Sequence, residues 1–284
     1  MEAEQQFQET ARQARRAAGS RWLDAAERLG YVVRGLLYGA MGVLALQVAL
    51  GVGGQAVDQR GGLLFITRNP FGRASLVVCV VGLAAYALWG PVRAVFDPWN
   101  RGSDAGGLLQ RLGYLWSGLS YAVLVVFGLQ LLVGANRAGV SQDPVQGWVT
   151  ELLSHPAGDW LTVAAGAIAV SGGLAQFIEA YRAGFRRDLR RARMSEAERD
   201  AADLVGRLGY LGRGITFVVL GWLLVQAGLH RDPDQAHGYG GAFLFLLAQP
   251  YGRLLLGFVS LCFVALGLHS LAYARWARTL ANRW

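Results

Sequence analysis

The sequence predicts an all-α integral membrane protein, with six transmembrane helices arranged as three parallel helical hairpins around a pseudo-threefold axis. The chain is 54% hydrophobic and only 16% charged, with a mean hydropathy of +0.31, which is too apolar for a soluble protein of its length. Six apolar runs approach the ~20 residues that a helix needs to cross a bilayer. The tetrapeptide Arg-Leu-Gly-Tyr occurs three times, at 28–31, 111–114 and 207–210. These features indicate three copies of one two-span unit.

Each repeat is expected to contain a first span, a short interfacial helix, a Pro-x-Gly turn and a second span. The separation from the repeat arginine to the turn proline is 42, 45 and 43 residues in the three copies (28 to 70, 111 to 156 and 207 to 250). Because two spans return the chain to the side it left, the copies are predicted to be parallel. The first spans are expected at 31–50, 114–133 and 210–229, the short helices at 63–66, 148–153 and 243–247, and the second spans at 74–96, 160–181 and 254–276.

The three turns each pair a proline with a glycine two residues later. Proline is favourable at the start of a helix, because the N–H that it lacks would have no helical partner there. The second span of each repeat should therefore begin at its turn. The pairs are Pro70 with Gly72, Pro156 with Gly158, and Pro250 with Gly252.

Polar segments divide the chain into a leader, three repeats and two links. In the second link, Ser195 and Glu198 match a capping box, so a helix is expected to begin there and run up to the third repeat. The predicted boundaries are 1–27 for an arginine-rich cytoplasmic leader, 28–97 for the first repeat, 98–110 for the first link, 111–181 for the second repeat, 182–206 for the second link, and 207–284 for the third repeat with a cytoplasmic tail.

All 27 basic residues are arginines, and the formal net charge is +8. In a membrane protein this charge favours contact with anionic lipid headgroups rather than with nucleic acid. The positive-inside rule predicts that both termini lie in the cytoplasm. In that topology the arginines on the opposite side are Arg60, Arg68, Arg73, Arg137, Arg231 and Arg253.

Two groups of arginines are candidates for contact with anionic lipid. Arg34 and Arg213 occupy equivalent positions in the first and third repeats, and each either snorkels to the cytoplasmic surface or pairs with Glu179, Asp97 or a lipid phosphate. A cluster in the second link either binds anionic headgroups or only enforces the topology. Its members are Arg186, Arg187, Arg190, Arg191 and Arg193.

The start of each repeat carries small and aromatic residues on one stripe of the first span. Small residues allow two helix backbones to approach closely, so this stripe is interpreted as a helix-packing seam. With the repeat arginines, the signature positions are Arg28, Gly30, Tyr31, Gly35 and Tyr38 in the first repeat, Arg111, Gly113, Tyr114, Gly118 and Tyr121 in the second, and Arg207, Gly209, Tyr210, Gly214 and Phe217 in the third.

Three glutamines recur nineteen residues after the repeat arginines, at Gln47, Gln130 and Gln226. They are expected near the far end of the first spans, on a different helix face from the glycine and tyrosine stripe. If that face points to the pseudo-axis, the amides line a central cavity that can bind water, an ion or a polar solute. The alternative is that each amide hydrogen-bonds a neighbouring helix or a loop backbone.

The sequence contains no recognisable catalytic or metal-binding pattern. The four histidines, His155, His230, His237 and His269, lack zinc-site spacing, and neither HExxH nor CxxC occurs. Cys79 and Cys262 lie in apolar runs and are interpreted as buried hydrophobic residues. No catalytic residue, metal or cofactor is therefore predicted.

Three two-span units, each opening with the arginine-aromatic signature and turning at Pro-x-Gly, resemble the bacterial membrane family known as domain of unknown function 1206. The resemblance covers about residues 25–280 and rests on 28–38, 111–121 and 207–217 with the three turn prolines. It implies a six-span protein of the bacterial inner membrane and no particular activity. The second repeat departs from the pattern, with Ser117 in place of the inner arginine and Asp159 in place of the turn arginine.

Three kinds of function are compatible with these features. The leading hypothesis is a non-enzymatic scaffold or accessory subunit that presents its basic cytoplasmic segments to lipid or to a protein partner, because the sequence places no charge in the middle of a span. The alternative is a channel or carrier for a small solute or ion through the centre of the three repeats. The least favoured hypothesis is an intramembrane or lipid-modifying enzyme.

Overall fold

The computed structural model describes residues 21–67, 71–96, 102, 104–134 and 143–277. Its secondary structure over these residues is helical, and six helices are long and apolar enough to cross a membrane. The predicted all-α, six-span membrane fold is therefore confirmed. The six helices are α2 (Arg21–Leu50), α4 (Gly72–Phe96), α5 (Ala105–Leu132), α7 (Gly158–Arg182), α8 (Glu196–His230) and α10 (Gly252–Trp276).

The first spans are longer helices than the apolar pattern indicated. The capping box at Ser195 and Glu198 is confirmed, but the helix that begins there continues without a break through the third Arg-Leu-Gly-Tyr and forms the 35-residue α8. Likewise α5 begins at Ala105, inside the expected first link, where the Asp104 side chain accepts a hydrogen bond from Gly107 N. No proline interrupts the polar segments that precede these two spans, so helical hydrogen bonding continues from the link into the span.

A short helix precedes each second span, as predicted, but it begins four residues before the expected apolar segment. These helices are α3 (Gln59–Thr67), α6 (Pro144–Leu153) and α9 (Tyr239–Leu247). The added turn has a local cause in α6, where Asp143 is the N-cap and Pro144 occupies the first helical position. Short 3-10 segments lie in the connections, at η2 (Gly184–Asp188), η3 (Arg191–Arg193) and η4 (Pro233–Gln235).

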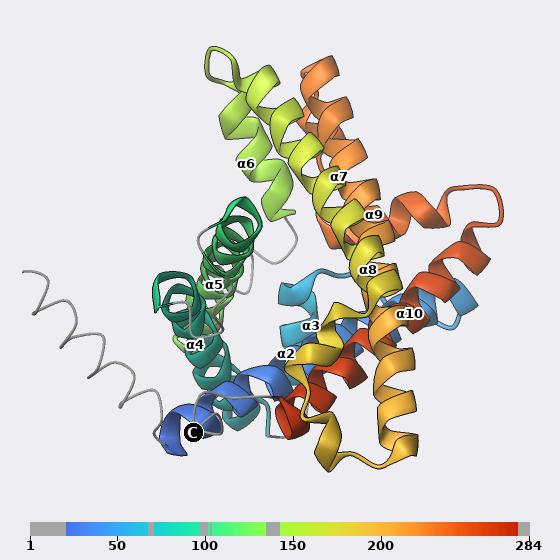
Figure 1. Ribbon diagram of the computed structural model, residues 1–284. Helices are drawn as coiled ribbons and strands as arrows, with labels where there is room; N and C mark the ends of the chain where they lie inside the picture. The colour runs from blue at the N-terminus through green and yellow to red at the C-terminus, as the bar shows by residue number, and fades with distance from the viewer. Residues whose placement is uncertain (1–20, 68–70, 97–101, 103, 135–142, 278–284) are drawn as a thin grey trace, which may run out of the picture.

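The spans pair mainly between repeats rather than within them. The most extensive helix contacts join α4 to α5, α7 to α8, and α10 to α2, so the second span of each repeat packs on the first span of the next, and the third repeat closes onto the first. Figure 1 shows these pairs as three arms, with α4/α5 at the left, α7/α8 at the upper right and α2/α10 across the lower half. Within the second repeat, by contrast, α5 and α7 barely touch.

Glycines of the signature stripe lie where the paired helices cross. An added methyl group on Gly35 would approach the Gly267 carbonyl oxygen to 2.9 Å, and one on Gly118 would approach the Ala87 carbonyl oxygen to the same distance. In the third pair, a methyl group on Gly214 would lie 3.1 Å from the Gly173 carbonyl oxygen. The equivalent glycines thus allow all three between-repeat pairs to approach at backbone distance.

Glycine is required at the turn that starts each second span. A Cβ atom on Gly72, Gly158 or Gly252 would collide with the carbonyl oxygen of Thr67, Leu152 or Leu247, respectively. Two of these glycines follow residues with left-handed backbone conformation, Ala157 at φ 66° and Tyr251 at φ 59°. Pro156 and Pro250 precede these residues, whereas Pro70 lies outside the described residues.

Candidate functional site

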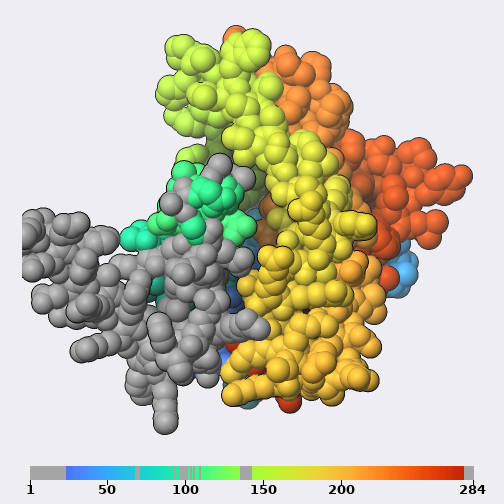
Figure 2. Space-filling model, viewed as in Figure 1, coloured from blue at the N-terminus to red at the C-terminus, as the bar shows by residue number. Residues whose placement is uncertain are grey.

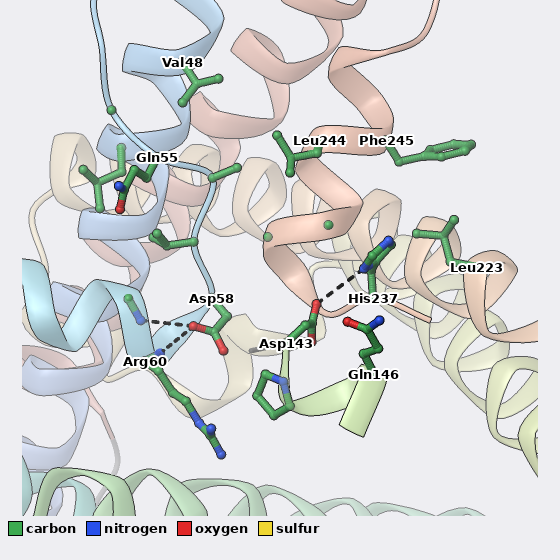
Figure 3. A pocket seen from close by; sticks show the side chains of 18 of the residues that line it. Val48, Gln55, Asp58, Arg60, Asp143, Gln146, Leu223, His237, Leu244 and Phe245 are labelled. Carbon is green, nitrogen blue, oxygen red and sulfur yellow. Dashed lines mark hydrogen bonds and ion pairs between the residues drawn. The ribbon is translucent and has the colours of Figure 1, made fainter. Parts of the chain in front are cut away.

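An open cavity of about 1360 Å³ lies where the beginnings of the three short helices meet the far ends of α2 and α8. Figure 3 shows Asp58, Asp143, Gln146 and His237 around one space, with Gln55 and Val48 on another side of it. Each repeat contributes to the wall: Asp58 and Arg60 from the first, Asp143 and Gln146 from the second, and His237 from the third. The cavity is therefore a site that no single repeat could form.

Asp58 is positioned by the helix that it caps. Its Oδ1 atom accepts hydrogen bonds from the backbone N–H groups of Arg60 and Gly61, both at 3.0 Å, which fixes the carboxylate at the start of α3. Burial raises the pKa of this carboxyl above its ordinary value, and the nearby Asp143 acts in the same direction. Asp58 thus binds a proton more readily than a solvated aspartate.

Asp143 joins the second and third repeats at the cavity. Its carboxylate accepts a hydrogen bond from Val145 N at 3.0 Å, which caps α6, and a second from Gly238 N at 2.8 Å, at the start of α9. His237 Nδ1 lies 3.8 Å from Asp143 Oδ2, close enough for an ion pair when the imidazole is protonated. One carboxylate therefore holds two helix beginnings together and faces a titratable partner.

The recurring glutamines take different places in the structure. Gln47 and Gln226 are partly buried and both line the cavity. Gln130 is exposed and is not among the lining residues. The repeats thus bring two of the three amides to one space, because α5 is displaced from the α7/α8 pair and carries Gln130 away with it. A solute-binding role for these amides stays a prediction.

The inner arginines contact aromatic side chains of the bundle, and their contact with anionic lipid stays a prediction. Arg34 Nη1 donates to the Tyr86 hydroxyl at 2.8 Å, and its guanidinium carbon lies 5.7 Å from the ring centroids of both Tyr38 and Tyr86. The Arg213 guanidinium carbon lies 5.2 Å from the Phe217 ring centroid. The protein groups that contact these guanidinium groups are therefore aromatic faces and a hydroxyl. Glu179 pairs with neither arginine, and Asp97 lies outside the described residues.

Two of the repeat arginines bind the ends of neighbouring spans. Arg28 Nη1 donates to the carbonyl oxygens of Ala274 and Arg275 at 2.6 and 3.0 Å, near the end of α10. Arg111 makes the equivalent contacts with α4, to the carbonyl oxygens of Ala94 at 2.6 Å and Val95 at 3.1 Å. These carbonyls lie in the last turns of α10 and α4, so the arginines act as C-terminal caps between repeats. Arg207 is exposed and makes no such contact with the part of the chain that the structure describes.

The basic cluster of the second link is partly neutralised within the protein. Arg186 and Arg191 both pair with Asp203, at 2.7 and 2.6 Å. Arg190 is held through its backbone, since its N–H donates to Trp276 O at 2.8 Å. Arg187 and Arg193 are exposed, and neither side chain forms a hydrogen bond or an ion pair with another described residue. Figure 2 shows this link at the lower edge of the molecule.

The rest of the signature packs the interior. Tyr31 packs on Tyr86 and Tyr273, and Tyr210 packs on Phe185. The Tyr121 hydroxyl donates to the Tyr38 hydroxyl at 3.5 Å, which links equivalent positions of the first two repeats. The surroundings of an added Cβ also differ at equivalent glycines. A Cβ on Gly30 or Gly209 would meet a neighbouring helix, whereas one on Gly113 would have no described atom within 4 Å.

Sequence reasoning missed Asp58, Asp143 and His237. A signal for the two aspartates was present, since each stands five residues before the apolar segment of its short helix, and Asp143 precedes a proline in the manner of an N-cap. His237 carries no comparable local signal, because only tertiary contact brings it to Asp143. Within the described parts of the chain, no group of three or more His, Cys, Asp or Glu side chains is arranged to hold a metal ion.

Comparisons with known proteins agree with this three-repeat architecture. A Bacillus subtilis (strain 168) protein described as "Uncharacterized protein YxxB" is 30% identical over 250 residues, which covers 88% of this chain and 90% of that protein. No solved structure matches the chain. The family described as Domain of Unknown Function (DUF1206) matches at residues 29–97, 112–183 and 208–277, once for each repeat. The chain is therefore a multi-pass membrane protein that belongs to the DUF1206 family.

Proposed function

We propose that this protein is a channel or carrier that binds a small polar solute in the cavity at the far end of its spans. The observation that carries the proposal is the convergence of all three repeats on one polar cavity lined by Gln47, Gln226, Asp58 and Asp143. Two carboxylates and several amides offer acceptors and donors to an uncharged or cationic solute. The arginine distribution supports a bacterial inner-membrane protein with cytoplasmic termini, so that this cavity would open to the outside.

Accessibility of single cysteines tests the cavity in intact membranes. Cysteine is introduced at Gln47 or Gln226 in a background where the buried Cys79 and Cys262 are replaced by alanine. A membrane-impermeant thiol reagent is expected to label both positions. Matched control cysteines replace Leu37, which is 1% exposed, and Val126, which is exposed on the outside of α5. Both controls should resist the reagent.

Solute movement is then measured in proteoliposomes, with glycerol as an uncharged probe and choline as a cationic probe. Flux above that of protein-free vesicles, reduced by labelling at Gln226→Cys, is the expected result. Labelling at neither cavity position would contradict a water-filled site. Labelling without flux of either probe would favour the second candidate function.

The second candidate is a scaffold or accessory subunit that contacts anionic lipid or a protein partner on its cytoplasmic face. The exposed Arg187 and Arg193, left without partners beside the neutralised Arg186 and Arg191, favour this function. The double variant Arg187→Gln/Arg193→Gln should retain less co-purified phosphatidylglycerol than the parent protein. Arg182→Gln, at another exposed arginine that ends α7, is the control. Equal lipid content in parent and double variant would exclude this contact.

A further inference from the structure

Arg34 and Arg213 are brought together in the interior between the first and third repeats. They occupy the same place in their repeats, six residues after Arg28 and Arg207. The Arg34 guanidinium carbon lies 5.7 Å from the Tyr38 ring centroid, and that of Arg213 lies 5.2 Å from the Phe217 ring centroid. The Tyr38 and Phe217 rings belong to one aromatic cluster, in which Phe263 contacts Tyr38 and Tyr239, and Tyr239 contacts Phe217. Two guanidinium groups therefore share one tyrosine-lined region, well inside α2 and α8 and apart from the residues that line the cavity.

The protein does not neutralise these two charges. No ion pair joins Arg34 or Arg213 to a carboxylate among the described residues. The Nε atom of each is buried and has no hydrogen-bond partner. The groups that contact the Arg34 guanidinium are the Tyr86 hydroxyl and the rings of Tyr38 and Tyr86, which are neutral in their ordinary form.

Such an arrangement is unfavourable unless another group supplies the missing charge. An arginine side chain stays protonated in a protein, and burying it without a counter-ion is costly, even more so beside a second positive charge. Both side chains retain some accessible surface, so protein atoms do not fill all the space beside them. The Tyr38 hydroxyl accepts a hydrogen bond from Tyr121, which leaves its own hydrogen free to donate.

We propose that Arg34 and Arg213 form an internal phosphate-binding site, in which one phosphate group bridges the two guanidinium groups and accepts a hydrogen bond from Tyr38. The planar fork of an arginine, Nε with one Nη, matches two oxygens of a phosphate, and the unpartnered Nε atoms provide that donor on both residues. A phosphate suits two forks better than a carboxylate, because it has more oxygens and can carry more negative charge. The phosphate belongs either to inorganic phosphate or to a lipid headgroup between the repeats.

Thermal unfolding of the purified full-length chain in an uncharged detergent tests the site, followed by the fluorescence of its nine tryptophans. The probes are inorganic phosphate, with chloride at matched ionic strength, and short-chain phosphatidylglycerol, with the matching diacylglycerol. The variants are Arg34→Gln, Arg213→Gln and Arg34→Lys, which keeps the charge but loses the fork. Arg207→Gln is the control, since it removes an exposed arginine from the same helix as Arg213.

One probe is expected to raise the unfolding temperature of the parent protein and of Arg207→Gln. Loss of either fork should weaken that binding about tenfold or more, equivalent to one charge-assisted hydrogen-bonded pair. An effect of inorganic phosphate identifies the free ion as a ligand, and an effect of phosphatidylglycerol alone identifies a lipid headgroup. If both glutamine variants fail to fold, weaker binding by Arg34→Lys makes the same distinction. The proposal is overturned if neither probe acts, or if the fork variants respond like the parent.

Discussion

Arg28 and Arg34 lie six residues apart on α2, yet their surroundings are opposite. Arg28 donates to the carboxylate Oδ2 of Asp24 at 2.9 Å. It also donates to two carbonyl oxygens at the C-terminal end of α10, at 2.6 and 3.0 Å. Among the described residues, Arg34 has a single acceptor, the Tyr86 hydroxyl at 2.8 Å, and a buried Nε without any. The same contrast separates Arg111, which caps α4, from Arg213, whose buried Nε also has no hydrogen-bond partner.

This comparison distinguishes arginines that stabilise the fold from arginines that are buried at a cost in folding free energy. A helix-capping arginine satisfies carbonyl groups that would otherwise lack partners, so it stabilises the protein on its own. A buried, unpaired arginine destabilises the protein until a ligand arrives, which is the usual reason for a charge inside a membrane domain. Two arginines that both occupy recurring repeat positions can therefore have different roles.

Removal of the Arg28 side chain should have the largest effect. Arg28→Ala leaves the carbonyls of Ala274 and Arg275 without their donor and breaks the closure of the third repeat on the first. Since hydrogen bonds to charged groups contribute ~1.5–3 kcal/mol each, a loss of about 3 kcal/mol in unfolding free energy is expected. Denaturant unfolding in mixed micelles measures it. A loss within experimental error would contradict the stabilising role of Arg28.

Arg34→Met should act in the opposite direction when phosphate and anionic lipid are absent. Replacing an uncompensated buried charge with an apolar side chain of similar length is expected to stabilise the protein by about 1–4 kcal/mol. The advantage over the parent should shrink as phosphate is added, because the ligand stabilises only the protein that binds it. Destabilisation in phosphate-free buffer would show that Arg34 is as structural as Arg28.

Asp58→Asn extends the comparison to an acidic group, with a smaller effect that depends on pH. Burial raises the pKa of Asp58 in the folded protein above the ordinary 3.8, so the folded state holds its proton where the unfolded chain has already lost it. Stability should therefore fall as pH rises from 3.8 through the raised pKa, and the contribution of this group is most favourable below that window. An asparagine side chain can still cap α3, but it does not titrate, so the dependence of stability on pH that Asp58 causes is lost. An unchanged slope in the variant would assign the pH dependence to other groups.

Arg207→Gln should have the smallest effect. Arg207 opens the third repeat as Arg28 opens the first, but it is exposed and caps no neighbouring helix. The expected change in unfolding free energy is within about 0.5 kcal/mol, as for surface substitutions in general. A change close to that of Arg28→Ala would mean that the repeat position, not the contacts, determines the role of these arginines.

The six spans, the three short helices and the capping box at Ser195 could be predicted from the sequence, because they depend on local properties. Apolar length determines which segments can cross a bilayer, and caps and prolines determine where helices begin. The glycines at the turns follow the same logic, since the carbonyl oxygens that exclude a side chain there belong to the preceding short helix. The recurrence of the tetrapeptide alone showed that these elements come in three copies.

Only the tertiary structure decided what each helix face meets. Spans of different repeats share more extensive contacts than spans of one repeat, so Arg28 binds carbonyl groups of α10. For the same reason Gln47 and Gln226 line one cavity, and Gln130 does not. Arg34 contacts Tyr86 for the same reason, because its face of α2 packs against α4. Helical periodicity places residues on a common face, but the partner of that face depends on packing between segments distant in the chain.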